Sequence, residues 1–250
     1  MNKNAYEEMF AVEDKHWWYV GLHDLAVLLI NEFLPQGQLK ILDVGCGTGG
    51  LLSIISKLGH DVEGLDYSED ALYYCHKRGL KNVFKADINE WEPGQKLYDV
   101  ITSFDVLSHE WIKDEAQIIK ALAKSLKDQG MIMLNYPAFP ILRRRHDRVV
   151  MMRKRYTKKT LVHLLSEASL TPTVLSYRVP HAFFVLLLLR ILESLTTTRQ
   201  ESQSDIATTP SELINNALIQ VIKFENRAIA RGFSFPLGSS LFAIARKTVR

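Results

Sequence analysis

A glycine-rich segment, Asp43-Val-Gly-Cys-Gly-Thr-Gly-Gly50, is the feature that most restricts the fold of this chain. The short apolar run at 39–44 predicts a strand before it, and residues 51–58 carry Leu and Ile at helical spacing. A glycine turn between a strand and a helix lets a ligand approach bare backbone, and the helix N-terminus offers N–H donors. The sequence therefore predicts an α/β fold built around a ligand-binding turn.

The rest of the chain alternates between strand and helix patterns. Apolar runs predict further strands at 61–66, 83–86, 98–103, 131–136, 171–179 and 240–247. Helices are expected after Ser68, at 114–127, at 157–168 and, before the first strand, at 18–34, where Pro35 ends the pattern. This order predicts a doubly wound, seven-stranded, mostly parallel sheet with helices on both faces and a ligand crevice at the carboxyl ends of the strands.

About 60 residues separate the last two predicted strands, far more than an ordinary hairpin loop contains. An apolar window at 182–195 is followed by a polar stretch at 196–209, which we expect to be mobile. Thr209, Pro210 and Glu212 then form a capping box that opens another helix. We interpret these residues as a helical cap inserted into a single domain.

The composition indicates one core and a reducing compartment. A hydrophobic fraction of 47% over 250 residues supplies one sizeable core and excludes a disordered or fibrous chain. Cys46 and Cys75 are too few for a disulfide framework and lack metal-ligand spacing, so we expect no metal site and a cytoplasmic protein. The N-terminal residues have no apolar run of the kind that a secretory signal carries.

The apolar window at 182–195 leaves the relation to membranes open. It contains Arg190 and Glu193 and is shorter than the roughly 20 residues that a membrane span needs. One interpretation is a helix packed in the core. The other is a helix on a membrane surface, because a basic segment precedes it and anionic lipids attract cationic charge.

Two acids beside the glycine turn indicate which ligand it binds. Gly45, Gly47 and Gly50 satisfy G-x-G-x-x-G, and Asp66 ends the second strand, 21 residues after Gly45, where a carboxylate can hold ribose hydroxyls. These features fit a nicotinamide dinucleotide as well as other adenosine cofactors. Asp43 separates the two, since it would repel a pyrophosphate at the turn but attract a cationic ligand.

Four motifs in order give the chain a family resemblance. LDVGCGTG at 42–49, GLD at 64–66, KAD at 85–87 and DVLSH at 105–109 resemble the class I S-adenosylmethionine-dependent methyltransferases. The resemblance covers about residues 39–137 and implies a Rossmann-like methyltransferase fold that binds S-adenosyl-L-methionine. It divides the chain into an N-terminal helical lid (1–38), a cofactor-binding core (39–179), a helical cap (180–239) and the last strand (240–247).

The resemblance also implies roles for individual residues. Asp43, Gly45, Gly47 and Gly49 would surround the methionine part of the cofactor, and Asp66 would hold the ribose. Asp87 and Ile88 would face the adenine, and Phe104 and Asp105 would close the pocket after the fourth strand. Tyr67 is a further residue expected to bind the cofactor. Alternative interpretations are an ordinary strand-end turn for Asp87 and a helix cap for Asp105.

Methyl transfer is an in-line displacement, so the protein must mainly align the reactants and exclude water. A hydroxyl nucleophile needs a base, and His109, just beyond the fourth strand, has a suitable intrinsic pKa. Alternatively, His109 only forms a hydrogen bond to backbone.

The aromatic run His16-Trp17-Trp18-Tyr19 suggests a lid, because three adjacent aromatic residues on a helix cannot all face one core. With Arg155-Tyr156-Thr157 and the segment that begins at Phe235, it resembles a bacterial subgroup of these methyltransferases that acts on natural products or on cell-envelope glycans and lipids. The substrate residues implied are Trp18, Tyr19, Tyr136, Arg145 and His146.

The chain departs from the subgroup's pattern at two places. Leu22 stands where the subgroup usually has an Arg, and Met151 and Met152 stand where it usually has a His. The roles of those positions are therefore open here, or neighbours such as His23 and His146 take them. A methyltransferase-like binding protein without turnover is consequently one alternative function, and an NAD(P)-dependent oxidoreductase is another.

The charge of the chain is concentrated in one segment. Residues 143–159 contain nine Lys or Arg and a single acid, Asp147, so the segment carries +8 and the remainder −5 of the net +3. An anionic acceptor, small or lipid-linked, would explain it, and so would a solvated surface whose bases pair with acids elsewhere. Nucleic acid is disfavoured because no aromatic and basic RNA-binding motif accompanies the segment. The oligomeric state stays open.

Overall fold

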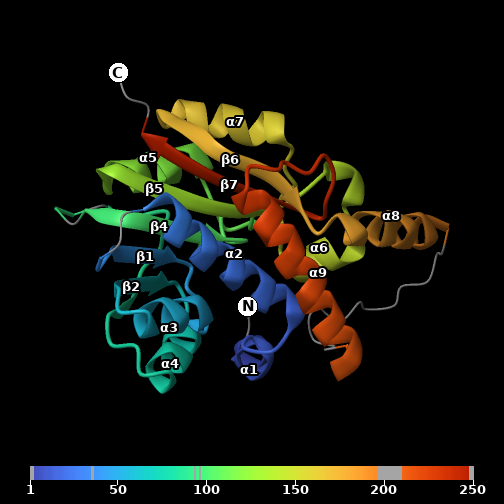
Figure 1. Ribbon diagram of the computed structural model, residues 1–250, viewed down its shortest axis with the longest axis horizontal. Coiled ribbons are helices and arrows are strands. Elements are labelled where there is room, and N and C mark those ends of the chain that lie inside the picture. Colours follow the sequence, from blue (N-terminus) through green and yellow to red (C-terminus); the bar gives the residue numbers. More distant parts are fainter. Residues whose placement is uncertain (1–2, 35–36, 93, 96, 196–209, 248–250) are drawn as a thin grey trace.

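The computed structural model describes residues 3–34, 37–92, 94–95, 97–195 and 210–247. Within them one central sheet has the strand order β3-β2-β1-β4-β5-β7-β6 (Figure 1). Only the pairs of β7 with β5 and β6 are antiparallel, so the predicted mostly parallel, seven-stranded sheet is confirmed. The strands are β1 Lys40–Val44, β2 Asp61–Asp66, β3 Val83–Lys85, β4 Tyr98–Phe104, β5 Leu126–Pro137, β6 Leu170–Arg178 and β7 Ser240–Lys247.

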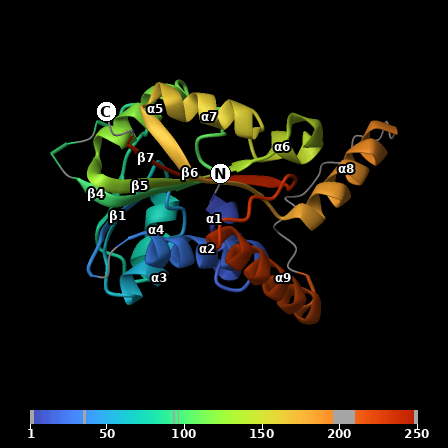
Figure 2. The same cartoon turned by 45° about the horizontal axis from the view of Figure 1, so that its top comes forward.

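Helices cover both faces of the sheet (Figure 2). One face carries α5 (Glu115–Lys124) and α7 (Lys158–Glu167). The other carries α2 (Trp17–Phe33), α3 (Gly50–Lys57) and α9 (Glu212–Ala230). The remaining helices are α1 Lys3–Val12, α4 Glu69–Lys77, the 3₁₀ turn η1 Pro140–Leu142, α6 Arg145–Val149 and α8 Pro180–Leu195.

Strand β5 shows why the strands are apolar throughout. Ile132 and Leu134 pack with the helices on one face, whereas Met131 and Met133 pack with those on the other, and all four are fully buried. Side chains alternate across a sheet, so a strand covered on both faces needs apolar residues at every position.

The glycine turn takes a backbone shape that needs glycine. Gly45, Gly47 and Gly49 have φ values of 75°, 54° and 79°, in the left-handed region. A Cβ on Gly45 would also lie 2.3 Å from the Val106 side chain. The turn therefore brings bare backbone to the edge where β1, β2 and β4, which are parallel, all end.

Two predicted boundaries are wrong. The helix expected at 114–127 ends at Lys124, and β5 begins at Leu126 rather than near Met131, because Leu126 already pairs with Tyr98. The last helix begins at Glu212 with Ser211 as its N-cap residue. Thr209 of the predicted capping box, the stretch at 196–209 and Pro35 lie outside the described residues.

The two helices of the predicted cap lie differently. Helix α9 packs along α2, where a Cβ on Gly21 would lie 2.5 Å from Ile222. Helix α8 projects from the body at the end where α6 lies (Figures 1 and 2). No helix among the described residues is long and apolar enough to cross a membrane.

Candidate functional site

A cavity of about 1560 Å³ opens at the carboxyl edge of the parallel strands. Its walls come from α1, α2, the glycine turn, the ends of β2 and β4, the region of α6, and α8. The predicted site residues that line it are Trp18, Tyr19, Asp43, Gly45, Gly47, Asp66, Tyr67, Asp87, Ile88, Phe104, Asp105, His109 and His146. Those outside the lining are Gly49, Tyr136 and Arg145.

Asp43 is a buried carboxylate without a cationic partner among the described residues. It is 5% exposed, and its Oδ1 accepts a hydrogen bond of 2.6 Å from Thr102 Oγ1. Burial raises the pKa of Asp43 to about 7, and the charges of Glu13 and Asp66 add to the rise. A cation in the cavity would therefore interact favourably with this group.

Asp66 orders the glycine turn and still faces the cavity. Its Oδ2 accepts from the Gly47 N–H at 3.0 Å, and its Oδ1 accepts from the Ser68 N–H at 2.9 Å. Burial raises the pKa of this carboxyl. Each oxygen has a second lone pair, so ligand hydroxyls can still donate to it. Ser68 occupies the N-cap position of α4 as predicted, without a side-chain capping bond.

The side chains expected around the adenine lie at the cavity wall. Asp87 Oδ1 accepts a hydrogen bond from the Asn89 N–H at 2.9 Å. This contact forms the strand-end turn that was the alternative interpretation of Asp87. Ile88 is 4% exposed and gives this part of the wall an apolar surface.

Asp105 adopts a left-handed backbone conformation, with φ 58°. Both of its carboxylate oxygens accept from Asn135 Nδ2, at 3.0 and 2.9 Å. Burial raises the pKa of Asp105 to about 6, against the lowering by Arg178 and Arg155. The alternative of a helix cap is wrong, because the next helix, α5, begins at Glu115 with Asp114 as its N-cap.

His109 lines the cavity, as a base would have to, and it also contacts backbone, as the alternative interpretation predicts. Its Nδ1 lies 3.3 Å from the Met151 carbonyl oxygen. A carbonyl only accepts, so Nδ1 carries the proton in this contact and the lone pair is on Nε2. Burial lowers the pKa of His109, which keeps the ring neutral near neutral pH. The Trp111 ring stacks on the imidazole.

The aromatic run forms a wall of the cavity. Trp17, Trp18 and Tyr19 are all half-buried and all line it. The Trp17 N–H donates to Asn215 Oδ1 at 2.9 Å, which ties the start of α2 to α9. Leu22, at the position where the subgroup has Arg, is buried at the same wall and supplies no charge.

Three predicted site residues lie elsewhere. Tyr136 is 1% exposed and packs against the Tyr156 ring in the core, with the ring planes tilted by 36°, so the substrate role expected for it has no support. Arg145 donates through its backbone N–H to Glu193 and lies outside the cavity lining. Gly49 is the N-cap of α3, and a Cβ on it would lie 2.6 Å from Leu80. It is therefore needed for the conformation of the turn but does not line the cavity.

The basic segment at 143–159 is largely paired with acids. Arg155 holds Asp147 through two short bonds, Arg144 pairs with Glu193, and Arg153 and Lys154 both reach Glu115. Arg144 and Arg155 are its only Arg or Lys among the cavity-lining residues, and both have acid partners. The expectation of an anionic acceptor therefore gains no support, and the interpretation as bases paired with acids accounts for much of the segment.

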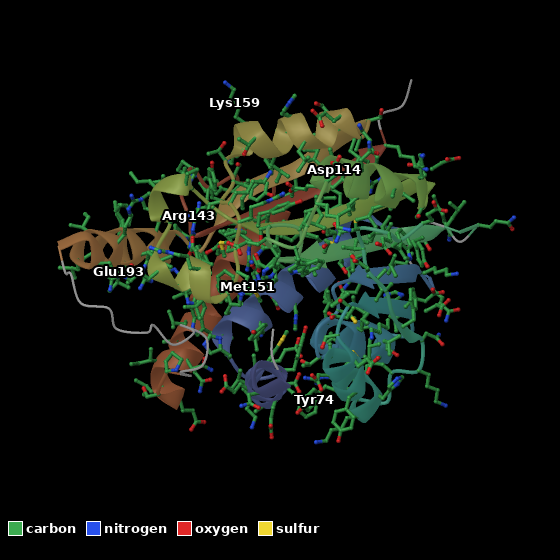
Figure 3. All side chains as sticks on the ribbon, turned by 180° about the vertical axis from the view of Figure 1, so that it is seen from behind. Tyr74, Asp114, Arg143, Met151, Lys159 and Glu193 are labelled. Atoms are coloured by element: carbon green, nitrogen blue, oxygen red, sulfur yellow. The ribbon has the colours of Figure 1, made fainter. Side chains whose placement is uncertain are left out.

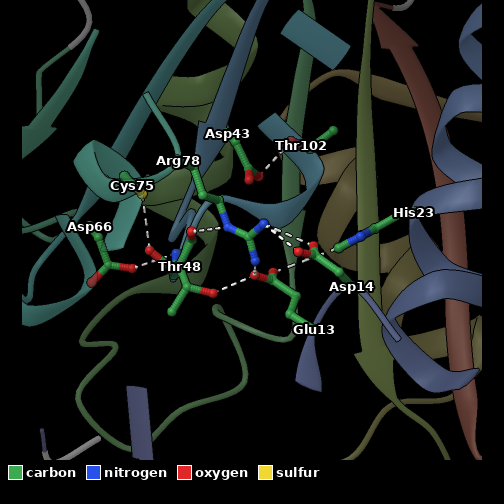
Figure 4. Close-up of polar contacts among 10 residues, drawn as sticks. Glu13, Asp14, His23, Asp43, Thr48, Asp66, Cys75, Arg78 and Thr102 are labelled. Atoms are coloured by element: carbon green, nitrogen blue, oxygen red, sulfur yellow. Dashed lines mark hydrogen bonds and ion pairs between the residues drawn. The ribbon is translucent and has the colours of Figure 1, made fainter. Parts of the chain in front are cut away.

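An ion network that was not predicted joins the end of α1 to the glycine turn (Figure 4). Arg78 donates to Glu13 at 3.0 Å and to Asp14 at 2.8 Å, and its Nε donates to the Thr48 carbonyl at 2.8 Å. Thr48 Oγ1 donates to the 2% exposed Glu13. Glu13 and Arg78 are 65 residues apart, so no local pattern signals the contact.

Arg178 was also missed, although it lies at the carboxyl edge of β6. It is fully buried, and its three guanidinium nitrogens have no hydrogen-bond partner among the described residues. Its Nε lies 3.9 Å from Glu225 Oε1 on α9, and Asp105 is among the acids that act on it.

Known proteins are similar to this chain in sequence and in fold. A family described as "Methyltransferase domain" matches residues 15–173. The ubiquinone biosynthesis O-methyltransferase of Hydrogenovibrio crunogenus is 32% identical over 134 residues, which are 48% of this chain and 54% of that protein. That of Pseudomonas aeruginosa (strain UCBPP-PA14) is 30% identical over 135 residues, 48% of this chain and 56% of the relative. The matches thus span about half the length of these curated relatives.

Solved structures share the fold at low identity. An S-adenosylmethionine-dependent methyltransferase from Mesorhizobium loti superposes with a TM-score of 0.58 at 17% identity, over 87% of this chain and 95% of that one. The Haemonchus contortus phosphoethanolamine N-methyltransferase 2, in complex with S-adenosyl-L-methionine, gives 0.56 at 19% identity, over 90% and 52%.

Proposed function

The chain belongs to the methyltransferase domain family, and from this premise we propose that it transfers a methyl group from S-adenosyl-L-methionine to a hydroxyl of a small or lipid-linked acceptor. S-adenosylmethionine is the methyl donor of this class of enzyme. The observation that carries the proposal is that Asp43, Asp66 and His109 line one cavity beside the glycine turn.

The residues present fit the cofactor. Asp43 is a buried carboxylate that lacks a cationic partner among the described residues, which suits a ligand carrying an ammonium and a sulfonium. Asp66 offers acceptor lone pairs for ribose hydroxyls, and Ile88 an apolar surface for a base. A Cβ on Gly45 would lie 2.3 Å from the Val106 side chain, and a Cβ on Gly47 would lie 3.0 Å from the Met9 side chain, so the turn has little room for side chains at these two positions. When bound, S-adenosylmethionine supplies an electrophilic methyl group on sulfur.

His109 is proposed as the base for a hydroxyl acceptor. The contact of its Nδ1 with the Met151 carbonyl leaves the Nε2 lone pair to accept a proton. Its lowered pKa keeps it neutral at the pH where a base is needed. An oxygen acceptor is in keeping with the relatives, which are named O-methyltransferases.

The proposed acceptor is apolar at the end that enters the cavity. Trp18 of α2, Val149 and Met151 at the end of α6 and just after it, and Leu186 of α8 give the wall an apolar part, beside the polar Arg144 and His146. Apolar walls exclude water from the reacting groups and favour a hydrocarbon or aromatic acceptor over a glycan.

We expect labelled methyl groups from S-adenosylmethionine to enter the organic extract of bacterial membranes when the protein is added. His109→Gln lowers this rate by about 10²- to 10⁴-fold, since a general base contributes that much, and leaves the affinity for S-adenosylhomocysteine unchanged. His109 must be neutral to act, so the rate falls as the pH drops below its lowered pKa.

At saturating S-adenosylmethionine, where the protonation of Asp43 does not limit binding, the acid limb of the pH profile should be absent in His109→Gln. An unchanged rate in this variant would show that His109 is not the base. If no compound in the extract is labelled although S-adenosylmethionine binds, the chain is the binding protein without turnover instead.

A further inference from the structure

Helix α8 carries a row of large apolar side chains that face solvent. Their exposed fractions run from 37 to 63%, and they are Phe184, Val185, Leu188, Leu189, Ile191 and Leu192. Residues four apart lie above one another on a helix, so these side chains form one face, which we call the α8 face. Contiguous exposed apolar surface of this kind marks an interaction site.

The opposite side of α8 is fixed to the body, so the α8 face points outward. Phe183 is 9% exposed and packs edge-on against Phe139, with the ring centroids 5.3 Å apart. Near the other end, Arg144 pairs with Glu193 at 2.8 Å, and Arg190 donates to the Ile141 carbonyl. The helix projects from the molecule in both ribbon views (Figures 1 and 2).

The segment that contacts α8 extends the apolar surface. Ile141, Val149 and Met151 are 55, 50 and 41% exposed, and residues 141–145 touch α8 through the bonds to Arg190 and Glu193. Figure 3 shows Arg143 and Met151 on the same side of the molecule as Glu193.

This surface is cationic. The acids within 141–151 and 180–193 are Asp147 and Glu193, and each is held by an Arg. Arg143 and Arg148 are exposed and make no ion pair in the part of the chain that the structure describes. Exposed apolar side chains flanked by unpaired cations are complementary to an anionic lipid surface. The apolar side chains can be buried among the lipids, and the cations are attracted to the anionic headgroups.

The same elements wall the cavity. Ala182 and Leu186 of α8, together with Val149 and Met151, line it. A bilayer that rests on the α8 face would thus lie beside the apolar part of the cavity.

We propose that the α8 face and the segment 141–151 dock on an anionic lipid bilayer, from which a lipid-linked acceptor enters the cavity. The docking itself is independent of the proposed methyl transfer, whereas the entry of the acceptor rests on it.

The test is co-sedimentation of the full chain with vesicles of phosphatidylcholine alone or mixed with phosphatidylglycerol, at low and high salt. We expect binding to the anionic vesicles, weakened by salt, and its loss in the double variant Phe184→Glu/Leu188→Glu. Arg143→Gln and Arg148→Gln should each lower the partition by roughly fivefold, the effect of one charge near an anionic surface. Leu58→Glu, a control at a 53% exposed site on the opposite end of the sheet, should bind like the wild type.

Three results would overturn the proposal: no binding to anionic vesicles at low salt, undiminished binding of Phe184→Glu/Leu188→Glu, or a wild-type dimer in sedimentation velocity that this variant makes monomeric. The last would mean that a second copy covers the α8 face. Neither Phe184 nor Leu188 lines the cavity, so S-adenosylhomocysteine should bind the variant normally. Failed docking with intact cofactor binding would leave the proposed function standing.

Discussion

Arg178 places a positive charge inside the protein at the end of β6. It is fully buried, Glu225 lies 3.9 Å from its Nε, and Asp105 acts on it as well. Burial lowers its pKa and raises that of Glu225, so each depends on the other to stay charged. A buried pair of this kind contributes little net stability, but the loss of one partner is costly.

Arg178→Met should therefore lower the free energy of unfolding by about 3 kcal/mol, because Glu225 is left as an uncompensated buried charge. Arg178→Met/Glu225→Gln should recover much of this loss, since the amide oxygen can still accept from the Val179 N–H. Urea unfolding of both variants measures the difference. Equal stability of the single variant and the wild type, or a double variant no better than the single one, would contradict this view of the pair.

The residues of the site differ in how far the sequence predicts them. Asp43 and Asp66 lie at the carboxyl ends of predicted strands, and His109 lies a few residues beyond another. Parallel strands bring such ends to one edge of a sheet, so the place of these residues at the cavity was predictable. Tyr136 was misplaced because side chains alternate across a strand and the sequence does not show which face of β5 meets the cavity. The place of Glu13 at the cavity was not predictable, because it depends on the contact with Arg78, 65 residues away in the sequence.

At the scale of elements, the strands and a helical N-terminal region were predictable, but the separate short helix α1 within that region was not. The strands are buried on both faces and are therefore apolar runs that the sequence shows directly. Helix α1 is ten residues long and acquires its packing from α4, where Phe10 stacks on Tyr74 at 4.8 Å. Isolated helices of that length are marginal, so tertiary contacts determine its position.

Arg78→Met should loosen α1 from the glycine turn. The side chains of Arg78 and Glu13 are 9 and 3% exposed, so the variant leaves the Glu13 carboxylate buried beside the cavity without its arginine partner. We expect faster amide hydrogen exchange in residues 3–12 and several-fold weaker binding of S-adenosylhomocysteine.

Lys127→Met is the matched control for this variant. The side chains of Lys127 and its ion-pair partner Asp99 are 46 and 21% exposed, and neither residue lines the cavity. The substitution should therefore have little effect on the exchange of α1 or on ligand binding. Equal exchange of α1 in the two variants would show that Arg78 does not hold this helix.

For the whole molecule, the net charge of +3 is a sum of two regions with different roles. The cavity wall around the glycine turn carries Asp43, Asp66 and Asp105, which suits a cationic cofactor. The +8 segment compensates buried acids and leaves exposed bases beside α8. The sequence showed that the charge is uneven, but its pairing depends on tertiary contacts such as that of Lys154 with Glu115.

The binding of S-adenosylhomocysteine, followed by titration calorimetry at about pH 6 and about pH 7.5, tests the account most directly. The raised pKa of Asp43, about 7, means that its carboxyl is mostly protonated at the lower pH and mostly ionised at the higher one. An ammonium ligand favours the ionised form, so the wild type should bind several-fold more tightly at about pH 7.5. Asp43→Asn should bind about tenfold to hundredfold more weakly there, the worth of a charged hydrogen bond, and should lose most of the pH dependence, the rest coming from Asp105, whose pKa is about 6. Equal affinity of the two proteins at both pH values, or tighter binding of NADH than of S-adenosylhomocysteine, would contradict it.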